Sequence, residues 1–595
     1  MSEFTPRFNT LVDILEHSTA TFRDRPLFGE KVNASWSWMS YGAFREEVDR
    51  IRTGLAHLGV ARGDSVGIIA NNRPEWAIAA YGAYGLGAAV VPMYEAQSRD
   101  DWEYILGDSG ARVVFVASEG IRKRVAAFGD RLADLDHVIA FEPGDTEGAA
   151  WFGDLGTDTE ATVAPAEVTP ADIAGFVYTS GTTGKPKGVL LSHANLAHNV
   201  SAITDVFPLV PDDRTLSFLP WAHAFGQTVE LHAVVAMGAS TAFAEATHKL
   251  MDNLGEVQPT MLVSVPRIFT RIYDGLQQRM ADEGGVKKRL FDAAIANALE
   301  RQRLAEEGKT NRRVELLHRL FDGLVFAKVR ERLGGNLKYA ISGGAAIPVD
   351  VARFIDALGI TVYEGYGLSE TSPIATANWP GSRVIGSVGK PIPGVRVELR
   401  PAESAAPGGG EIVVYGHNVM QGYHNLPNEN AKVFTDDGGF RTGDLGRFDD
   451  DGFLHIIGRV KEQYKLANGK YVVPTIIEDK LSLSPYIANA MVYGENRPFN
   501  VALIVLDTAA VERWAKDQRL EVGHDEMVND PRVLELIAGE ISAHATGIAR
   551  YEHIREFTLL TEDFTTDNGM LTPTLKVKRR VVFDRFTDHV ERLYG

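Results

Sequence analysis

The chain has 595 residues, of which 45% are hydrophobic and 24% charged, and its formal net charge is −18. Single hydrophobic cores stop growing at roughly 250–300 residues, so we expect at least two domains. The acidic balance makes nucleic acid a poor partner, because phosphate recognition depends on clustered lysine and arginine. The absence of cysteine excludes disulfides, thiolate metal sites and a cysteine nucleophile.

No run of about 18 uncharged apolar residues occurs, so no segment is predicted to span a bilayer. The first residues lack the basic flank and apolar core of a secretory signal, so we expect a cytoplasmic protein. Residues 286–335, however, hold 12 Lys/Arg against 7 Asp/Glu. This segment is either a solvated helical face or a surface that rests on anionic lipid, which leaves peripheral membrane contact open. The sequence is also compatible with an oligomer.

The first half of the chain alternates short apolar runs with helical patterns. Residues 74–86 predict a helix, and buried strands are expected at residues 64–70, 87–92, 111–117 and 260–266. This alternation favours parallel sheets covered by helices. Residues 287–333 repeat leucine at helical spacing and predict a helical segment.

The pattern changes at about residue 395. Residues 395–399 and 411–415 alternate like strands around a Pro/Gly-rich turn, which indicates a small β-rich lobe. We therefore predict an α/β protein whose N-terminal domain, residues 1–458, holds two parallel-type β-sheet subdomains covered by helices plus this lobe. Residues 459–595 are predicted to form a small α+β C-terminal domain.

The most informative motif is the stretch 178–189, which reads Tyr-Thr-Ser-Gly-Thr-Thr-Gly-Lys-Pro-Lys-Gly-Val. Its glycines let the backbone approach phosphates, its hydroxyls donate hydrogen bonds, and its lysines add positive charge. Neither the P-loop pattern nor the Rossmann glycine pattern fits it. The stretch therefore predicts a differently built phosphate loop with these candidate residues: Thr179, Ser180, Gly181, Thr182, Thr183, Gly184, Lys185 and Lys187.

This stretch resembles the signature of the acyl-adenylate-forming superfamily, which includes acyl-CoA synthetases, luciferases and peptide-synthetase adenylation domains. Further motifs of that superfamily follow in its order, and the resemblance spans residues 21–580. It implies that ATP, with Mg²⁺, activates a carboxylic acid as its adenylate. It also implies that the C-terminal domain is a mobile lid, which rotates between adenylation and transfer to a thiol.

By the same resemblance, the turn Ser342-Gly-Gly-Ala-Ala346 supplies Gly343 and Gly344 beside adenine. In the stretch 363–371, Tyr366 would stack on adenine next to Gly367. Ser369, where the family usually has threonine, would touch the α-phosphate, and Glu370 would reach Mg²⁺. A carboxylate that bridges a hard cation to a triphosphate is chemically reasonable.

Three later motifs complete the resemblance. Asp444, in Arg441-Thr-Gly-Asp-Leu445, would accept the ribose hydroxyls, and Arg459 would contact ribose or phosphate. Lys465 would serve the thioester step. Lys576 would be the catalytic lysine of adenylation, although the motif Pro573-Thr-Leu-Lys576 departs from the common Ser-Gly-Lys form and leaves Lys578 as an alternative.

The acid and the acceptor also follow from resemblance. His223 lies in the acyl-pocket motif 217–226, where Trp221 is either a gating aromatic over a fatty-acid tunnel or a core residue. Residues 465–478 resemble the hinge-following signature of long-chain fatty-acyl-CoA synthetases. We therefore expect a long-chain fatty acid and coenzyme A as substrates. The alternative is a fatty-acyl-AMP ligase that loads a carrier protein.

Overall fold

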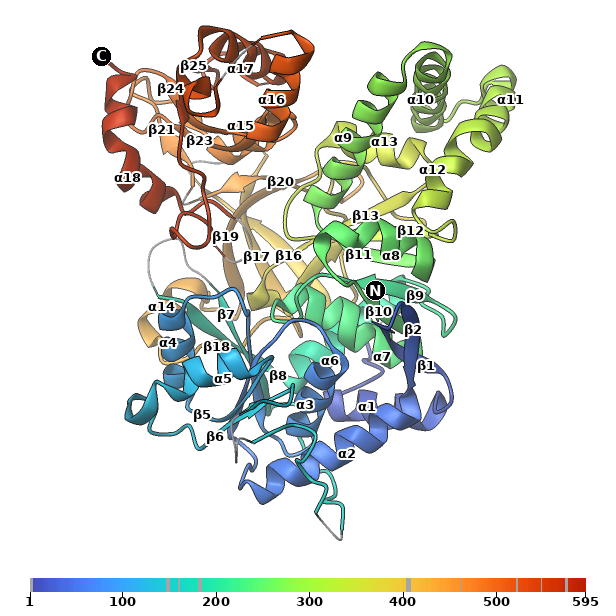
Figure 1. Cartoon of the computed structure of the whole chain (residues 1–595), viewed down its shortest axis with the longest axis vertical. Helices are drawn as coiled ribbons and strands as arrows, with labels where there is room; N and C mark the ends of the chain where they lie inside the picture. Colours follow the sequence, from blue (N-terminus) through green and yellow to red (C-terminus); the bar gives the residue numbers. More distant parts are fainter. Residues whose placement is uncertain are drawn as a thin grey trace.

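The computed structural model describes residues 4–145, 150–158, 161–179, 185–402, 408–460, 462–520, 523–546, 548–572 and 576–595. It confirms the predicted α/β class, with a large N-terminal part of several sheets and helices and a smaller C-terminal part (Figure 1). The largest core packs both sheet and helix residues of the first 440 positions.

A seven-stranded sheet lies at the base of the N-terminal part, in the order β18-β8-β7-β4-β3-β5-β6. The strands β3, β4, β5, β6 and β7 run parallel, and β8 and then β18 extend the sheet with antiparallel pairings. Every residue of β3 and β4 is buried, which explains their uninterrupted apolar sequence. The bounds are β3 (Ser65–Ile69), β4 (Ala89–Met93), β5 (Ala111–Val116), β6 (His137–Ala140), β7 (Ile173–Thr179), β8 (Lys187–Ser192) and β18 (Gly422–Tyr423).

The second subdomain combines a four-stranded sheet, β2-β1-β10-β9, with a five-stranded sheet, β11-β12-β13-β14-β15. Strands β11, β12 and β13 are parallel, and β14 and β15 are antiparallel additions. The bounds are β1 (Pro26–Val32), β2 (Ser35–Ser40), β9 (Arg214–Ser217), β10 (Ser240–Phe243), β11 (Met261–Ser264), β12 (Tyr339–Ser342), β13 (Thr361–Gly367), β14 (Ile374–Ala377) and β15 (Lys390–Pro391).

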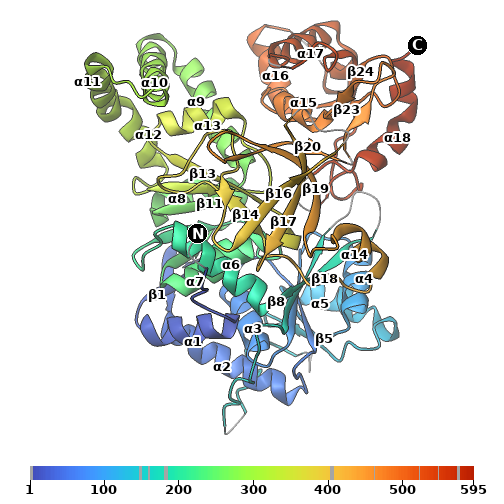
Figure 2. The same cartoon turned by 180° about the vertical axis from the view of Figure 1, so that it is seen from behind.

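The predicted β-rich lobe is an antiparallel sheet in the order β16-β17-β19-β20. Its strands are β16 (Val395–Arg400), β17 (Gly410–Gly416), β19 (Phe440–Phe448) and β20 (Leu454–Arg459). Figure 2 shows these strands between the seven-stranded sheet and the C-terminal part. The lobe thus connects the base of the molecule with the segment that follows residue 459.

The C-terminal part holds two hydrophobic clusters whose buried members all come from residues 466–590. Its strands are β21 (Tyr464–Lys465), β22 (Tyr471–Val472), β23 (Ile487–Tyr493), β24 (Asn500–Leu506) and β25 (Ile554–Leu560). A separate core is the physical mark of a domain. These clusters support a boundary near residue 459, and the exact division at 458/459 stays a prediction.

The helices cover the sheets, and α9, α10 and α13 pack on one another beside the five-stranded sheet. No helix of the described ranges is both long enough and apolar enough to cross a bilayer. The α-helices are α1 (Leu11–Thr21), α2 (Tyr41–His57), α3 (Pro74–Tyr84), α4 (Arg99–Ser109), α5 (Glu119–Ala126), α6 (His193–Val206), α7 (Ala233–Met237), α8 (Leu250–Val257), α9 (Pro266–Glu283), α10 (Gly285–Glu306), α11 (Arg312–Phe321), α12 (Ala327–Arg332), α13 (Val349–Ala357), α14 (Pro427–Val433), α15 (Pro474–Leu481), α16 (Thr508–Asp517), α17 (Pro531–His544) and α18 (Arg579–Arg592).

Short helical turns complete the secondary structure. Two π-helical segments are η2 (Gly226–His232) and η4 (Asp322–Phe326). The 3₁₀ turns are η1 (Gly129–Arg131), η3 (Thr247–Lys249), η5 (Ser369–Thr371) and η6 (His524–Asn529).

Candidate active site

The predicted phosphate loop connects the antiparallel strands β7 and β8, whose Thr179 and Lys187 pair with each other. The Nζ of Lys187 lies 2.6 Å from Oε2 of Glu429, and the Nζ of Lys185 lies 4.8 Å from the ring centroid of Tyr104. Ser180, Gly181, Thr182, Thr183 and Gly184 lie outside the described residues. The structure therefore gives the two ends of the loop and places both lysines beside polar or aromatic partners.

The adenine-side turn begins where β12 ends. Gly344 has φ +84°, a left-handed conformation that a side chain disfavours. The buried Glu364, on the neighbouring strand β13, accepts the backbone N–H of Ile347 at 3.1 Å. Burial raises the pKa of Glu364 to about 7, with the hydrogen bond opposing this rise. Glu364 thus ties the turn to the strand that carries Tyr366.

Strand β13 ends at Gly367, where the backbone passes close to its neighbour. A Cβ at this position would lie 1.7 Å from the carbonyl oxygen of Pro373, so only glycine fits. Gly343, Gly344, Tyr366 and Gly367 all line one cavity. The structure therefore brings the two predicted adenine-side motifs together.

Asp444 joins two other candidate residues. Its carboxylate accepts the hydroxyl of Tyr366 at 2.7 Å through Oδ2 and the Nε–H of Arg459 at 2.6 Å through Oδ1. Asp444 and Arg459 are cross-strand neighbours on β19 and β20, which fixes their separation. The buried carboxylate is hydrogen-bonded on both oxygens, so its position is defined before any ligand arrives.

Glu370 lies in the turn η5, and its Oε1 accepts the hydroxyl of Tyr423 at 2.8 Å. The ring of Tyr423 also lies 5.1 Å from the Nζ of Lys187. The neighbouring Ser369 is buried. Tyr423 thus connects one end of the phosphate loop with the carboxylate predicted to reach Mg²⁺.

The described residues contain no group of three metal-ligating side chains. Mg²⁺ nevertheless binds commonly through one or two carboxylates together with substrate phosphates. A single carboxylate at Glu370, beside the hairpin that would hold the phosphates, fits that mode of binding. The donor set therefore suits a nucleotide-bound cation rather than a resident metal centre.

Lys576 lies among charged groups of both parts of the chain. Burial lowers its pKa, as does the positive charge of Arg459, while Asp444, Glu462 and Asp479 oppose the decrease. The residue keeps solvent-exposed surface, yet enough protein surrounds its ammonium group to desolvate it. Burial and, to a smaller extent, the positive charge of Lys576 lower the pKa of His223. The charge of Lys576 therefore interacts both with the candidate nucleotide residues and with the acyl-pocket motif.

Lys465 has different surroundings. It ends the short strand β21, is exposed, and its Nζ lies 4.7 Å from the ring centroid of Tyr471 on the paired strand β22. Lys465 thus lies on an exposed hairpin, and its role in the thioester step stays a prediction.

His223 lines the same cavity as Tyr366. The N–H of Phe225 donates to its Nδ1 at 3.2 Å, which places the ring proton on Nε2. Burial, with a smaller effect of Lys576, lowers the pKa of His223 to about 4, so the ring is neutral at neutral pH. A neutral imidazole with an Nε2–H can donate one hydrogen bond to a carboxylate or adenylate oxygen.

The cavity is apolar and narrow. Its volume is about 40 Å³, and its lining includes Ile203, Phe207, Val229 and Ile341. This space suits a water or two and not a long acyl chain, so such a chain would require these side chains to move. The lining residues come from α6, η2 and the second sheet.

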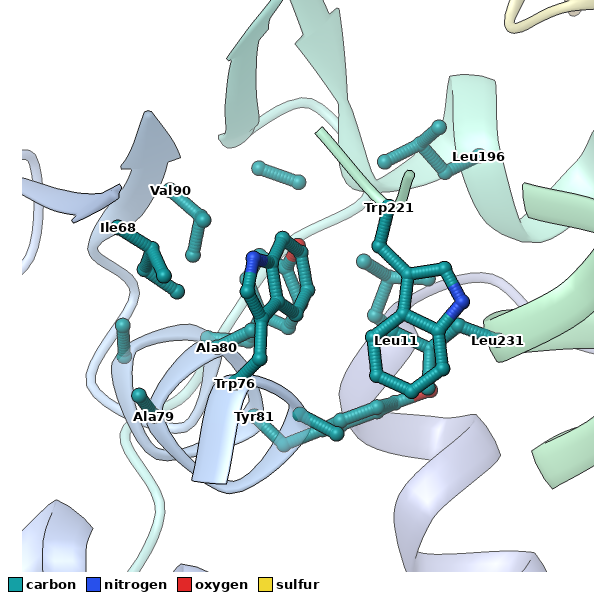
Figure 3. Close-up of a cluster of buried hydrophobic side chains, with 14 of the residues drawn as sticks. Leu11, Ile68, Trp76, Ala79, Ala80, Tyr81, Val90, Leu196, Trp221 and Leu231 are labelled. Atoms are coloured by element: carbon teal, nitrogen blue, oxygen red, sulfur yellow. The ribbon is translucent and has the colours of Figure 1, made fainter. Parts of the chain in front are cut away.

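Trp221 does not lie among the described residues that line this cavity. Its side chain is fully buried and packs against Phe28, Trp76 and Phe243, with ring centroids 5.3–5.9 Å apart. Figure 3 shows its indole beside Trp76 and Leu11 in the core. The structure therefore favours the core alternative, and a gating role for Trp221 stays a prediction.

Sequence reasoning missed Asn72, which holds the His223 loop. Its side chain donates to Ser217 and to the carbonyl of Leu219, and accepts the N–H of Trp221 at 2.8 Å. Asn72 lies three residues after the end of the buried strand β3 (Ser65–Ile69). Polar residues at the carboxyl end of a parallel strand commonly point to a site, and this signal could have identified it.

The comparisons with known proteins agree with this geometry. Residues 15–424 match the model of the AMP-binding enzyme family, and residues 461–595 match that of the AMP-binding enzyme C-terminal domain. The chain is 35% identical to the long-chain-fatty-acid–CoA ligase FadD15 of Mycobacterium bovis, covering 99% of this chain and 97% of the relative. It is 30% identical to human long-chain-fatty-acid–CoA ligase 1, covering 98% of this chain and 86% of the relative.

Among solved structures, the fold is similar to the adenylation domain of a carboxylate reductase from Mycobacterium chelonae. The TM-score is 0.80 at 20% identity, covering 99% of this chain and 92% of that one. A similarity at this identity concerns the fold alone, while the family matches cover most of the sequence. The chain belongs to the AMP-binding enzyme family, that is, the acyl-adenylate-forming superfamily, in its long-chain acyl-CoA synthetase branch.

Proposed function

We propose that this chain activates a long-chain fatty acid with ATP and transfers the acyl group to coenzyme A. In the first step, a carboxylate oxygen attacks the α-phosphorus of ATP, the bond to the β-phosphate oxygen breaks, and pyrophosphate leaves. In the second step, the sulfur of CoA attacks the acyl carbon and AMP leaves. The observation that carries the proposal is the geometry around Asp444, which binds Tyr366 and Arg459, while Tyr366 lines the same cavity as His223.

Charge dominates the barrier of the first step, because an anionic carboxylate approaches an anionic phosphate. The ammonium of Lys576 would stabilise the negative charge between the two reactants. Lys185 and Lys187, at the ends of the hairpin turn, would bind the outer phosphates. To do so, Lys187 must exchange its contact with Glu429 for phosphate oxygens.

The nucleoside would be held by residues that already contact one another. Asp444 would accept ribose hydroxyls, Tyr366 would stack on adenine above the turn with Gly343 and Gly344, and Ser369 would donate to the α-phosphate. Glu370 would hold Mg²⁺, which when bound offsets the negative charge of the phosphates. Tyr423 orients that carboxylate through its hydroxyl.

The acid would enter the apolar cavity beside the nucleotide. His223 would donate its Nε2–H to a carboxylate oxygen and so orient the acid toward the α-phosphate. The apolar lining favours an alkyl chain over a polar acid, since it offers few hydrogen-bond partners.

The second step would use the other face of the C-terminal domain. Rotation of residues 459–595 would withdraw Lys576 and present Lys465 near the adenylate. The proposal takes the described arrangement, in which the charge of Lys576 interacts with Arg459 and Asp444, as that of the first step. Support for a hinge comes from the separate hydrophobic clusters on either side of residue 459.

The test is a reaction of the purified chain with ATP, Mg²⁺, palmitate and CoA, with AMP, pyrophosphate and palmitoyl-CoA measured together. We expect all three products, and palmitoyl-AMP when CoA is omitted. Adenylate that never becomes thioester with CoA, but is transferred to an acyl carrier protein, would contradict the proposed acceptor. A scan of acids from acetate to stearate then defines the chain length.

A further inference from the structure

The helical segment from α11 through η4 to α12 presents an unusual surface. Figures 1 and 2 both place α10 and α11 at the margin of the molecule, at the end away from α1 and α2. Leu316, Leu320 and Leu324, spaced by four residues, are 70%, 55% and 48% exposed. Large aliphatic side chains in such a row on one helical face are costly in water unless something covers them.

Basic residues surround this leucine row. Arg312, Arg313, Arg319 and Lys328 are all exposed. Within the described part of the chain, no ion pair engages these four cations, whereas Arg301 holds Glu315 and Arg330 holds Asp322. The acidic groups of α11 and η4 are thus neutralised by their own neighbours, and the outward face is left positively charged.

We propose that this leucine row and its flanking cations dock the enzyme on anionic phospholipid bilayers. The three leucines would enter the boundary between headgroups and acyl chains, while the arginines bind lipid phosphates. An amphipathic helix with an apolar stripe between basic residues binds membrane surfaces in this way. The proposal goes beyond the catalytic function and does not depend on it.

The charge of the whole chain strengthens the argument. With a net charge of −18, most of the molecule is repelled by an anionic surface. At physiological ionic strength repulsion fades beyond about 8 Å, so a local cationic patch on a projecting element can still bind. The repulsion elsewhere would hold the enzyme in one orientation, with the α11 face toward the lipid.

A second copy of the chain is a less suitable occupant. A two-fold dimer through this patch would place it against itself, since the same surface is used on both subunits. Unpaired arginines would then face unpaired arginines in a desolvated interface, which opposes association. Lipid phosphates supply the opposite charge that another copy of the patch lacks.

The experiment is cosedimentation of the full-length protein, without ATP or fatty acid, with vesicles of phosphatidylcholine alone or mixed with phosphatidylglycerol. We expect binding to the mixed vesicles, weak binding to phosphatidylcholine, and release by high salt. Leu316→Ser should weaken partitioning by about tenfold. Arg313→Gln with Arg319→Gln should weaken it by about fivefold for each cation removed.

The matched control is Lys516→Gln with Arg550→Gln, which removes two exposed cations from the C-terminal part. We expect unchanged vesicle binding for this control, and unchanged adenylation of soluble octanoate for every variant, which verifies folding. The proposal is overturned if the unaltered protein ignores anionic vesicles, or if the control loses as much binding as the α11 variants. It is also overturned if Leu316→Ser dissociates an oligomer in light scattering and leaves vesicle binding intact.

Discussion

Lys576 and Lys465 belong to the same C-terminal part of the chain but have contrasting surroundings. Both side chains are exposed, but the charge of Lys576 interacts with Arg459, Asp444 and His223. Lys465 is exposed on a two-stranded hairpin beside the ring of Tyr471. Under the proposed function this arrangement offers Lys576 to the nucleotide, and use of Lys465 in the second step requires another arrangement of the domain.

The first prediction, with the largest expected effect, tests whether Lys576 serves adenylation and not the thioester step. Lys576→Ala should lower adenylate formation by about 10²–10³-fold, because it removes a preorganised charge from the transition state. Thioester formation from supplied acyl-AMP should stay largely intact. Single-turnover assays of each half-reaction measure the two effects separately.

The matched control for this variant is Lys578→Ala, which removes the other lysine of the motif. Its backbone N–H binds the carbonyl of Met570, so the local fold does not depend on the side chain. We expect near-normal adenylation for this control. Equal loss in both half-reactions for Lys576→Ala, or a larger loss at Lys578, would assign the catalytic charge elsewhere.

The second prediction concerns Lys465, for which we expect the thioester step, and not adenylation, to be impaired. Lys465→Ala should slow thioester formation on the order of tenfold to a hundredfold, the range expected when a positioning group is lost. Adenylation should remain near normal, since the proposed function assigns Lys465 to the thioester step alone. Lys470→Ala, at the turn of the same hairpin, is the control. If Lys465→Ala impairs adenylation alone, the two lysines do not divide the reaction.

The strands and the order of the motifs could be predicted because each depends on residues that are close together in the sequence. The fully buried β3 and β4 appear as unbroken apolar runs, and the predicted ranges differ from their bounds by one or two residues. A required glycine can also be recognised in the sequence motif where the backbone leaves no room for a side chain, as at Gly367. Local patterns of this kind predict the secondary-structure element and its motif, but not the contacts between elements.

The contacts between motifs could not be predicted, because they join distant positions. Tyr366 binds Asp444 across 78 residues, and Asn72 binds the backbone of Trp221 across 149. A tryptophan in an apolar motif reads the same whether it lines a tunnel or fills a core, so Trp221 was ambiguous. The three-dimensional packing against Phe28 and Trp76 favours the core alternative, and the gating role stays a prediction.

The third prediction tests whether the adenylation step assigned to Lys576 depends on ATP binding by Asp444. Asp444→Asn should raise the KM for ATP by about tenfold, because an amide cannot accept hydrogen bonds as strongly as a carboxylate held by Tyr366 and Arg459. The exposed Asp436→Asn is the control. Unchanged ATP dependence, measured by pyrophosphate release, would exclude Asp444 from the ribose site.

The fourth prediction separates the half-reactions by pH and has the smallest expected effect. Burial, reinforced by Arg459, lowers the pKa of Lys576, so its positive charge is lost at a lower pH than that of an ordinary lysine. Adenylation should therefore fall as the pH rises into the alkaline range. Thioester formation from supplied acyl-AMP should instead rise, since a free thiol of pKa about 8.5 gains about threefold in thiolate between about pH 8 and about pH 9.

Lys576→Arg provides the control for this pH dependence, because an arginine stays protonated throughout the range. In this variant, whatever its rate, adenylation should lose its alkaline decline while the thioester profile keeps its rise. Parallel profiles for the two half-reactions of the unaltered enzyme would contradict the division of labour between the lysines. Suppose instead that in the unaltered enzyme adenylation falls and thioester formation rises with pH, and that in Lys576→Arg only the rise of thioester formation remains. The group whose loss of charge slows adenylation is then Lys576, because no other side chain is changed.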